Sequence, residues 1–136
     1  MPEFEYKHRV RYRECDPMGV VYHTHYIDYL EEARTEALRE AGLPYKRIED
    51  SGIMMPVVDL AVRYYNPARY DDVVVVRTIF EDTIPRATVK IRYEVHRESN
   101  DDRLLSGHVT LCFVSRETGR PTRAPQILVD AFVQKH

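Results

Sequence analysis

The residues of this sequence that could do chemistry lie closest together between positions 9 and 26. Asp16 stands in a short loop with Pro17 and Gly19, and His23 follows where a helical pattern begins. A carboxylate beside the first turn of a helix lies near backbone N–H donors that have no partner inside the helix, and near the positive end of its dipole. Such donors can hold an oxyanion while the carboxylate attacks a carbonyl carbon or activates water. The pattern therefore predicts hydrolytic or acyl-transfer chemistry at Asp16.

An aspartate in a loop can also be only a turn former or a helix cap. Six residues separate Asp16 from His23, which is too far for a helix cap. Pro17 and Gly19 impose a particular backbone path that an ordinary solvated turn does not need. We therefore interpret Asp16 as a catalytic carboxylate.

The elements that must position this loop can be read from hydrophobic periodicity. Alternating residues over 6–12 predict a strand before the loop, and a 3.6-residue period over 24–41 predicts a helix after it. The connection 44–52 is expected to be a short link, and 126–132 a helical turn or a terminal strand extension. Four further strands are predicted between turn residues: 57–65, 73–81, 87–97 and 104–115. This order predicts an α+β fold whose antiparallel sheet could wrap around the helix.

Composition bounds the class of protein. The 136 residues suit one domain, 1–136, and 43% hydrophobic with 31% charged residues is typical of a soluble globular protein. A net charge of −2 argues against a general nucleic-acid binder. No apolar leader or run of membrane-spanning length is present, so we expect a cytoplasmic protein without membrane insertion. Two cysteines without paired spacing predict neither a disulfide framework nor a zinc ribbon.

The stretch 9–26 resembles the signature of the 4-hydroxybenzoyl-CoA thioesterase family of hotdog-fold acyl-CoA hydrolases. A second stretch, 64–72, resembles the turn that this family places between its second and third strands. The resemblance covers nearly the whole chain and implies a hotdog fold, an antiparallel sheet wrapped around one long central helix. Every constrained position of the signature is met, by Arg9, Val10, Cys15, Asp16, Gly19, Val20, Val21, His23 and Tyr26.

The resemblance implies an acyl-CoA thioesterase that releases a free acid and CoA from a short-chain or aromatic acyl-CoA, without cofactor or metal. It implies that Asp16 is the nucleophile or the general base, and these two roles remain open. It also implies an oxyanion contact from the backbone N–H of His23, because the family accepts an aromatic residue there. A role of the His23 side chain in orienting Asp16 or a water is the lesser alternative. Gly19, Val20 and Tyr26 fall in the substrate-binding part of the motif.

The same resemblance implies that Arg86, with Thr88 as a weaker candidate, contacts the CoA phosphates. An ordinary exposed arginine at a strand end is the competing interpretation of Arg86. The family places its active sites at a dimer interface, so a homo-oligomer is expected, either a dimer or a dimer of dimers (a homotetramer).

Other assignments stay open. A related hotdog group uses a glutamate on the helix, for which Glu31, Glu32 and Glu36 are candidates, although a solvated charged face explains them as well. A metal site is not expected, since residues two apart on a helix do not face each other. Three other functions remain as alternatives: an acyl-carrier-protein thioesterase, a non-catalytic acyl-CoA-binding protein and a hotdog dehydratase.

Overall fold

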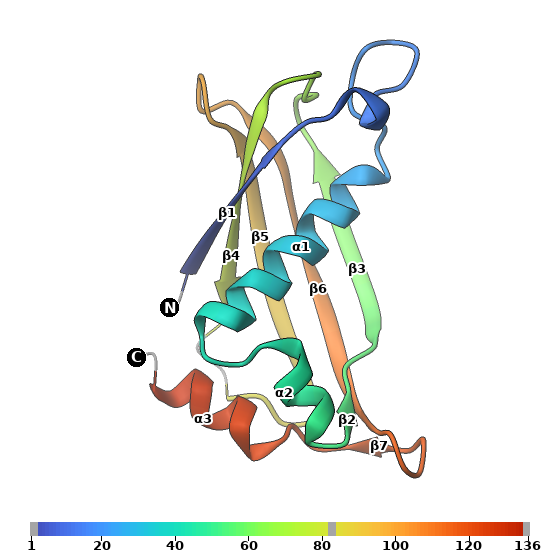
Figure 1. Ribbon diagram of the computed structural model, residues 1–136, viewed down its shortest axis with the longest axis vertical. Helices are drawn as coiled ribbons and strands as arrows, with labels where there is room; N and C mark the ends of the chain where they lie inside the picture. Colours follow the sequence, from blue (N-terminus) through green and yellow to red (C-terminus); the bar gives the residue numbers. More distant parts are fainter. Residues whose placement is uncertain (1–2, 82–83, 135–136) are drawn as a thin grey trace.

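The computed structural model describes residues 3–81 and 84–134. One long helix, α1 (His25–Glu40), lies diagonally across one face of an antiparallel sheet (Figure 1). Two shorter helices, α2 (Tyr45–Asp50) and α3 (Gln126–Gln134), lie at the end of the molecule away from the start of α1 (Figure 1). The remaining elements are β1 (Glu3–Arg9), a 3-10 helix η1 (Tyr12–Glu14), β2 (Ile53–Met54), β3 (Val57–Tyr64), β4 (Val73–Phe80), β5 (Thr88–Arg97), β6 (Arg103–Ser115) and β7 (Pro121–Thr122).

The strand order puts β1 and β3 at the two long edges of the sheet. β1 pairs with β4, β4 with β5 and β5 with β6, while β3 and the short β2 and β7 also pair with β6. Tyr64 lies opposite Leu105, and Val57 lies opposite Leu111. β3 therefore runs from the end near α2 toward the end where η1 and the loop before α1 lie (Figure 1). The α+β arrangement predicted from the sequence is confirmed.

The core forms because the inner face of the sheet and one face of α1 are both apolar. Along β5, Val89, Ile91, Tyr93 and Val95 are buried, whereas the intervening side chains point to the other face. The helix presents small residues at Ala33 and Ala37, which allow its backbone to approach the sheet closely. Its larger buried residues are Tyr26, Tyr29, Leu30 and Leu38.

Two sequence expectations need correction. β1 ends at Arg9, and residues 12–14 form the 3-10 helix, so Tyr12 is 80% exposed and does not lie on an inner strand face. The strand ends because the Glu14 carboxylate accepts the Arg11 N–H and tightens the chain into a turn. The link 44–52 contains α2, which buries Ile48. Of the two alternatives predicted for the C-terminal piece, the helical one is confirmed.

Candidate active site

Asp16 begins a tight turn at the tip of the loop before α1. Its carbonyl accepts the Gly19 N–H at 2.9 Å, and its own N–H donates to the Val20 carbonyl at 2.9 Å. Pro17 suits the second position of such a turn, because its ring fixes φ near the value required there. Gly19 has φ of +81°, a left-handed conformation that other residues adopt only with strain. Pro17 and Gly19 therefore favour the turn that places the Asp16 side chain at the tip of the loop.

The Asp16 carboxylate is partly exposed and has one hydrogen bond within the turn. Its Oδ1 accepts the Met18 N–H at 2.8 Å, which is the turn-forming role considered as the alternative to catalysis. No other hydrogen bond to this carboxylate is present among residues 3–81 and 84–134. One oxygen of the group thus orients the side chain, and the second can meet a substrate.

A hydrogen-bonded neck holds this loop to the rest of the protein. Tyr22 N–H donates to the Glu14 carbonyl at 2.9 Å, and Cys15 forms a β-bridge with Val21. Val21 N–H donates to the Ala68 carbonyl at 2.9 Å, which joins the loop to the turn between β3 and β4. We call the paired segments 14–16 and 20–22 the neck of the loop.

Tyr26 is linked to the neck through Ala68, whose carbonyl accepts the Val21 N–H. Its hydroxyl accepts the Ala68 N–H at 2.9 Å, and burial raises the pKa of this phenol. Val20 forms a second bridge to the same turn, at Arg69. Gly19 and Val20 are therefore hydrogen-bonded to Asp16 directly, whereas the buried Tyr26 is linked to the loop through Ala68.

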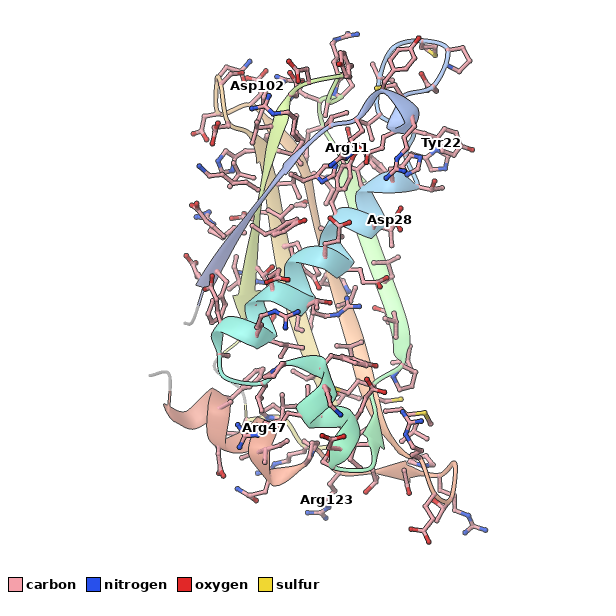
Figure 2. The ribbon with its side chains drawn as sticks, viewed as in Figure 1. Arg11, Tyr22, Asp28, Arg47, Asp102 and Arg123 are labelled. Carbon is pink, nitrogen blue, oxygen red and sulfur yellow. The ribbon has the colours of Figure 1, made fainter. Side chains whose placement is uncertain are left out.

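Two successive peptide groups before α1 have their carbonyls fixed by hydrogen bonds. The Tyr22 carbonyl accepts the His25 N–H at 3.0 Å, and the His23 carbonyl accepts the Tyr64 hydroxyl at 2.8 Å. In a trans peptide the N–H points opposite to the carbonyl, so these contacts orient the N–H groups of His23 and Thr24. Neither N–H has a partner among the described residues. Figure 2 shows Tyr22 beside the first turn of α1, where these donors lie.

Competing groups near Asp16 are less suited to the chemistry. Burial raises the pKa of the Cys15 thiol, which disfavours the nucleophilic thiolate. Glu32 accepts the Tyr6 hydroxyl at 2.9 Å, and Glu36 accepts Arg39 Nε at 3.3 Å, so two of the three helix glutamates have partners. Within the described ranges, no group of three or more His, Cys, Asp or Glu side chains is placed to hold a metal ion.

A cavity of about 310 Å³ borders the first half of α1 and has an acidic lining. Negative side chains repel the phosphates of CoA, so this cavity does not suit the nucleotide. Its lining residues are Arg13, Glu14, His25, Asp28, Tyr29, Glu31 and Glu32.

Arg86 and Thr88 lie far from Asp16 within one chain. Thr88 pairs with Cys112 at one end of β6, whereas Tyr64, which reaches His23, pairs with Leu105. The separation of seven positions along β6 corresponds to roughly 23 Å at the rise of a β-strand. One chain therefore does not bring Arg86 to the loop that carries Asp16.

Periodicity and motif matching missed three residues of this region. Tyr64 belongs to the second motif stretch, 64–72, but that motif does not predict its hydrogen bond to the His23 carbonyl. Glu14 and Tyr29 form a buried pair, with the Tyr29 hydroxyl donating to Glu14 Oε1 at 2.7 Å. Tyr29 lies three residues after Tyr26 and so shares its face of α1, which was the available signal.

Comparison with known proteins identifies the class. Residues 10–132 match the family model described as the thioesterase-like superfamily. The chain is 30% identical over 131 residues to the acyl-CoA thioester hydrolase YbgC of Escherichia coli, covering 96% of each protein. A hypothetical protein from Thermus thermophilus has a similar crystal structure, with a TM-score of 0.87, 38% identity and coverage of 97% of this chain and 98% of that one.

The DHNA-CoA thioesterase of Staphylococcus aureus is also similar, with a TM-score of 0.90, 29% identity and coverage of 99% and 91%. The chain belongs to the thioesterase-like superfamily and has its hotdog fold. It is a thioester hydrolase. No helix within the described ranges is both long and apolar enough to cross a bilayer.

Proposed function

We propose that this protein hydrolyses acyl-CoA thioesters, with Asp16 as nucleophile or general base and the backbone N–H of His23 as oxyanion donor. The observation that carries the proposal is the pair of oriented, unpartnered N–H groups at His23 and Thr24 in the loop that also carries Asp16. Donors held in advance of the reaction stabilise the charge that develops on a carbonyl oxygen. The helix that follows adds the positive end of its dipole.

Two routes use the same residues. In one, an Asp16 oxygen attacks the thioester carbon, the C–S bond breaks with its electron pair leaving on the CoA thiolate, and water then hydrolyses the mixed anhydride. In the other, Asp16 takes a proton from water while the hydroxide oxygen bonds to the same carbon and the thiolate leaves. A thiolate is a good leaving group, so neither route needs a strong general acid beside the sulfur.

The acyl group is proposed to be short or aromatic. Aromatic rings gather beside the candidate oxyanion donors, and they offer apolar faces and edges to a substrate ring. The ring of Tyr64 lies edge-to-face with those of Tyr26, at 5.4 Å between centroids, and His23, at 6.5 Å. Tyr22 and Tyr64 are both exposed, so a substrate ring can reach them.

A second copy of this chain is the proposed partner, paired through β3. This edge strand is exposed along seven of its eight residues, and Val57, Val58 and Leu60 present apolar side chains there. An exposed apolar edge is a template for pairing with another strand. The other edge strand, β1, is different because charged residues at Glu3, Glu5, Lys7 and Arg9 protect it.

Pairing of β3 with its copy across a two-fold axis would be antiparallel. The Val57 end of one copy would then lie beside the Tyr64 end of the other. Because Thr88 shares the Val57 end of the sheet, this arrangement carries the partner's Arg86 toward Asp16. We propose that CoA spans the two subunits, with its thioester at one and its phosphates at the other.

The test is thiol release from benzoyl-CoA by Asp16→Asn. The amide keeps the size and a hydrogen-bond acceptor for Met18 but loses basicity and nucleophilicity, so kcat is expected to fall at least ~100-fold. The matched control is Asp28→Asn, an exposed carboxylate on α1. Turnover of Asp16→Asn near the native rate would refute the assignment and direct attention to the helix glutamates.

A further inference from the structure

Glu14 lies two residues before Asp16, and only 7% of it is exposed. Acidic side chains are almost never buried to this extent unless they are paired, because removing a charge from water is unfavourable. The family signature leaves this position unconstrained. A buried charge in the neck of the catalytic loop therefore needs an explanation.

Donors from three different segments converge on this carboxylate. Oε1 of Glu14 accepts the Arg11 N–H at 3.0 Å, the Tyr29 hydroxyl at 2.7 Å and His8 Nε2 at 2.9 Å. The imidazole of His8 packs on the ring of Tyr29, with 4.4 Å between centroids. The side chain thus ties the 3-10 helix to α1 and to β1 at a single point.

The same contacts explain why the group stays ionised. Burial alone would raise the pKa of Glu14, but the hydrogen bonds from Tyr29, Arg11 and His8 outweigh it and lower this pKa below its ordinary value. Burial and the Glu14 charge raise the pKa of the Tyr29 phenol, so its proton remains in the hydrogen bond. Charge-assisted hydrogen bonds of this kind are shorter and stronger than neutral ones.

The main chain around Glu14 is bonded both to the segment that precedes His23 and to the segment that carries Asp16. The Glu14 carbonyl accepts the Tyr22 N–H at 2.9 Å, and Tyr22 directly precedes the proposed oxyanion donor at His23. On the other side, Cys15 is bridged to Val21 and Asp16 N–H is bonded to the Val20 carbonyl. The position of Asp16 relative to the start of α1 therefore depends on where Glu14 is held.

We propose that Glu14 is a positioning residue for Asp16, acting through its buried hydrogen bonds to Tyr29, His8 and the Arg11 N–H. This inference rests on the proposed role of Asp16 in thioester hydrolysis. Loss of the anchor lets the neck shift relative to α1, and a displacement of about 1 Å in an active site can lower the rate roughly 100-fold. The effect falls on kcat, because Glu14 is not expected to touch the CoA portion of the substrate.

The experiment measures kcat, KM and melting temperature with benzoyl-CoA for Glu14→Ala, Glu14→Gln and Tyr29→Phe. Glutamine keeps an oxygen for Arg11 and Tyr29, so Glu14→Gln should retain kcat within about threefold of native. Glu14→Ala should lose at least about tenfold in kcat with KM changed less than threefold, and Tyr29→Phe should fall between them. Rescue by glutamine identifies position, and not charge, as the contribution of Glu14.

Tyr93→Phe is the matched control, because it also removes a buried hydroxyl that bonds a charged partner, here Arg34 at 3.2 Å. It should lower the melting temperature about as much as Tyr29→Phe but keep the native kcat. Native kcat in both Tyr29→Phe and Glu14→Ala would overturn the inference and leave Glu14 with a role in stability alone. If Glu14→Ala does not fold, an equal kcat for Tyr29→Phe and Tyr93→Phe would overturn it by itself.

Asp16→Asn, measured in parallel, separates the two proposals. Native turnover in Asp16→Asn refutes the proposed function, whatever Glu14 does. An inactive Asp16→Asn with native kcat in both Tyr29→Phe and Glu14→Ala refutes only the positioning role. A Glu14→Gln variant as slow as Glu14→Ala would also refute it, because the carboxylate charge itself would then be required.

Discussion

The hydroxyl of Tyr64, at the end of edge strand β3, donates a 2.8 Å hydrogen bond to the carbonyl oxygen of His23. The two residues are 41 positions apart in the sequence, and the bond fixes the peptide group just before α1. Burial raises the pKa of this phenol, so its proton is retained at neutral pH. The orientation of the Thr24 N–H, which neighbours the proposed oxyanion donor at His23, is thus set by the same strand that we expect to meet a second subunit.

Tyr64→Phe should reduce kcat while leaving the fold intact. The variant keeps the ring but frees the His23 carbonyl, and a net hydrogen bond of about 0.5–1.5 kcal/mol corresponds to a rate loss of roughly two- to tenfold. The control is Tyr65→Phe, whose hydroxyl bonds Ser106 at 3.0 Å, away from His23. Steady-state kinetics that cannot distinguish the two variants would show that the Tyr64 contact has no role in turnover.

His23→Phe should retain far more activity than Asp16→Asn. The proposed donor is the backbone N–H, which survives replacement of the imidazole, and the adjacent Tyr64 bond is to the His23 carbonyl and not to its side chain. Thiol-release assays of the two variants at saturating acyl-CoA make the comparison. Equal inactivity of both would assign chemistry to the imidazole itself.

The sequence predicted α1 and the long strands well because they carry their own periodicity, whereas α2 and the two-residue strands β2 and β7 were not predicted. Asp16, Gly19 and His23 could also be proposed as candidate site residues from the sequence, since they fall within one contiguous motif. Contacts between segments distant in the sequence could not be predicted. Neither the periodicity nor the motif links Tyr64 to His23, or Ala68 to Tyr26. Arg86 shows the same limit, because its distance from Asp16 within one chain follows only from strand register.

Acid should weaken the native protein partly through Glu14. Its pKa in the folded state is lower than the ordinary 4.5, so its stabilisation is complete above about pH 4.5 and is lost as the pH falls through the lowered folded value. Urea unfolding of native protein and Glu14→Gln should therefore show a stability gap at neutral pH that closes in this acidic range. A gap that is independent of pH would contradict the lowered pKa.

The exposed pair Lys7–Glu98, at 2.6 Å, provides a contrast for that experiment. Lys7 lowers the pKa of Glu98 as well, but both side chains are about half exposed. Salt screens exposed charges more effectively than buried ones. A salt concentration of about 0.5 M NaCl shortens the Debye length to roughly 4 Å. It should therefore diminish the loss of stability caused by Glu98→Gln and leave the loss caused by Glu14→Gln largely unchanged.

Val58→Asp should dissociate the proposed dimer. Val58 is 58% exposed on edge strand β3, and a charge there opposes pairing with a second apolar edge. Tyr70→Asp is the control, because Tyr70 is also 58% exposed but lies in the turn before β4. Sedimentation velocity should show a smaller species only for Val58→Asp. An unchanged size for Val58→Asp would remove β3 as the interface.

The single variant Arg86→Ala tests whether this arginine binds the CoA phosphates. Arg86→Ala should raise KM for acyl-CoA more than it changes kcat, because an arginine pairs with phosphate and not with the reacting carbon. The KM for an acyl-pantetheine thioester, which lacks the nucleotide, should not change. An equal loss with both substrates would instead assign Arg86 to the fold or to the acyl pocket.

Refolding two impaired chains together tests whether one active site uses residues of two subunits. Asp16→Asn and Arg86→Ala chains are mixed in equal amounts and refolded. In a mixed dimer, one site combines both substitutions, and the other combines a native Asp16 with a native Arg86 from the partner. Random association therefore restores roughly a quarter of the sites to native kinetics, with the native KM. If Arg86 served the Asp16 of its own chain, every site of the mixed dimer would carry one defect and no low-KM activity would return.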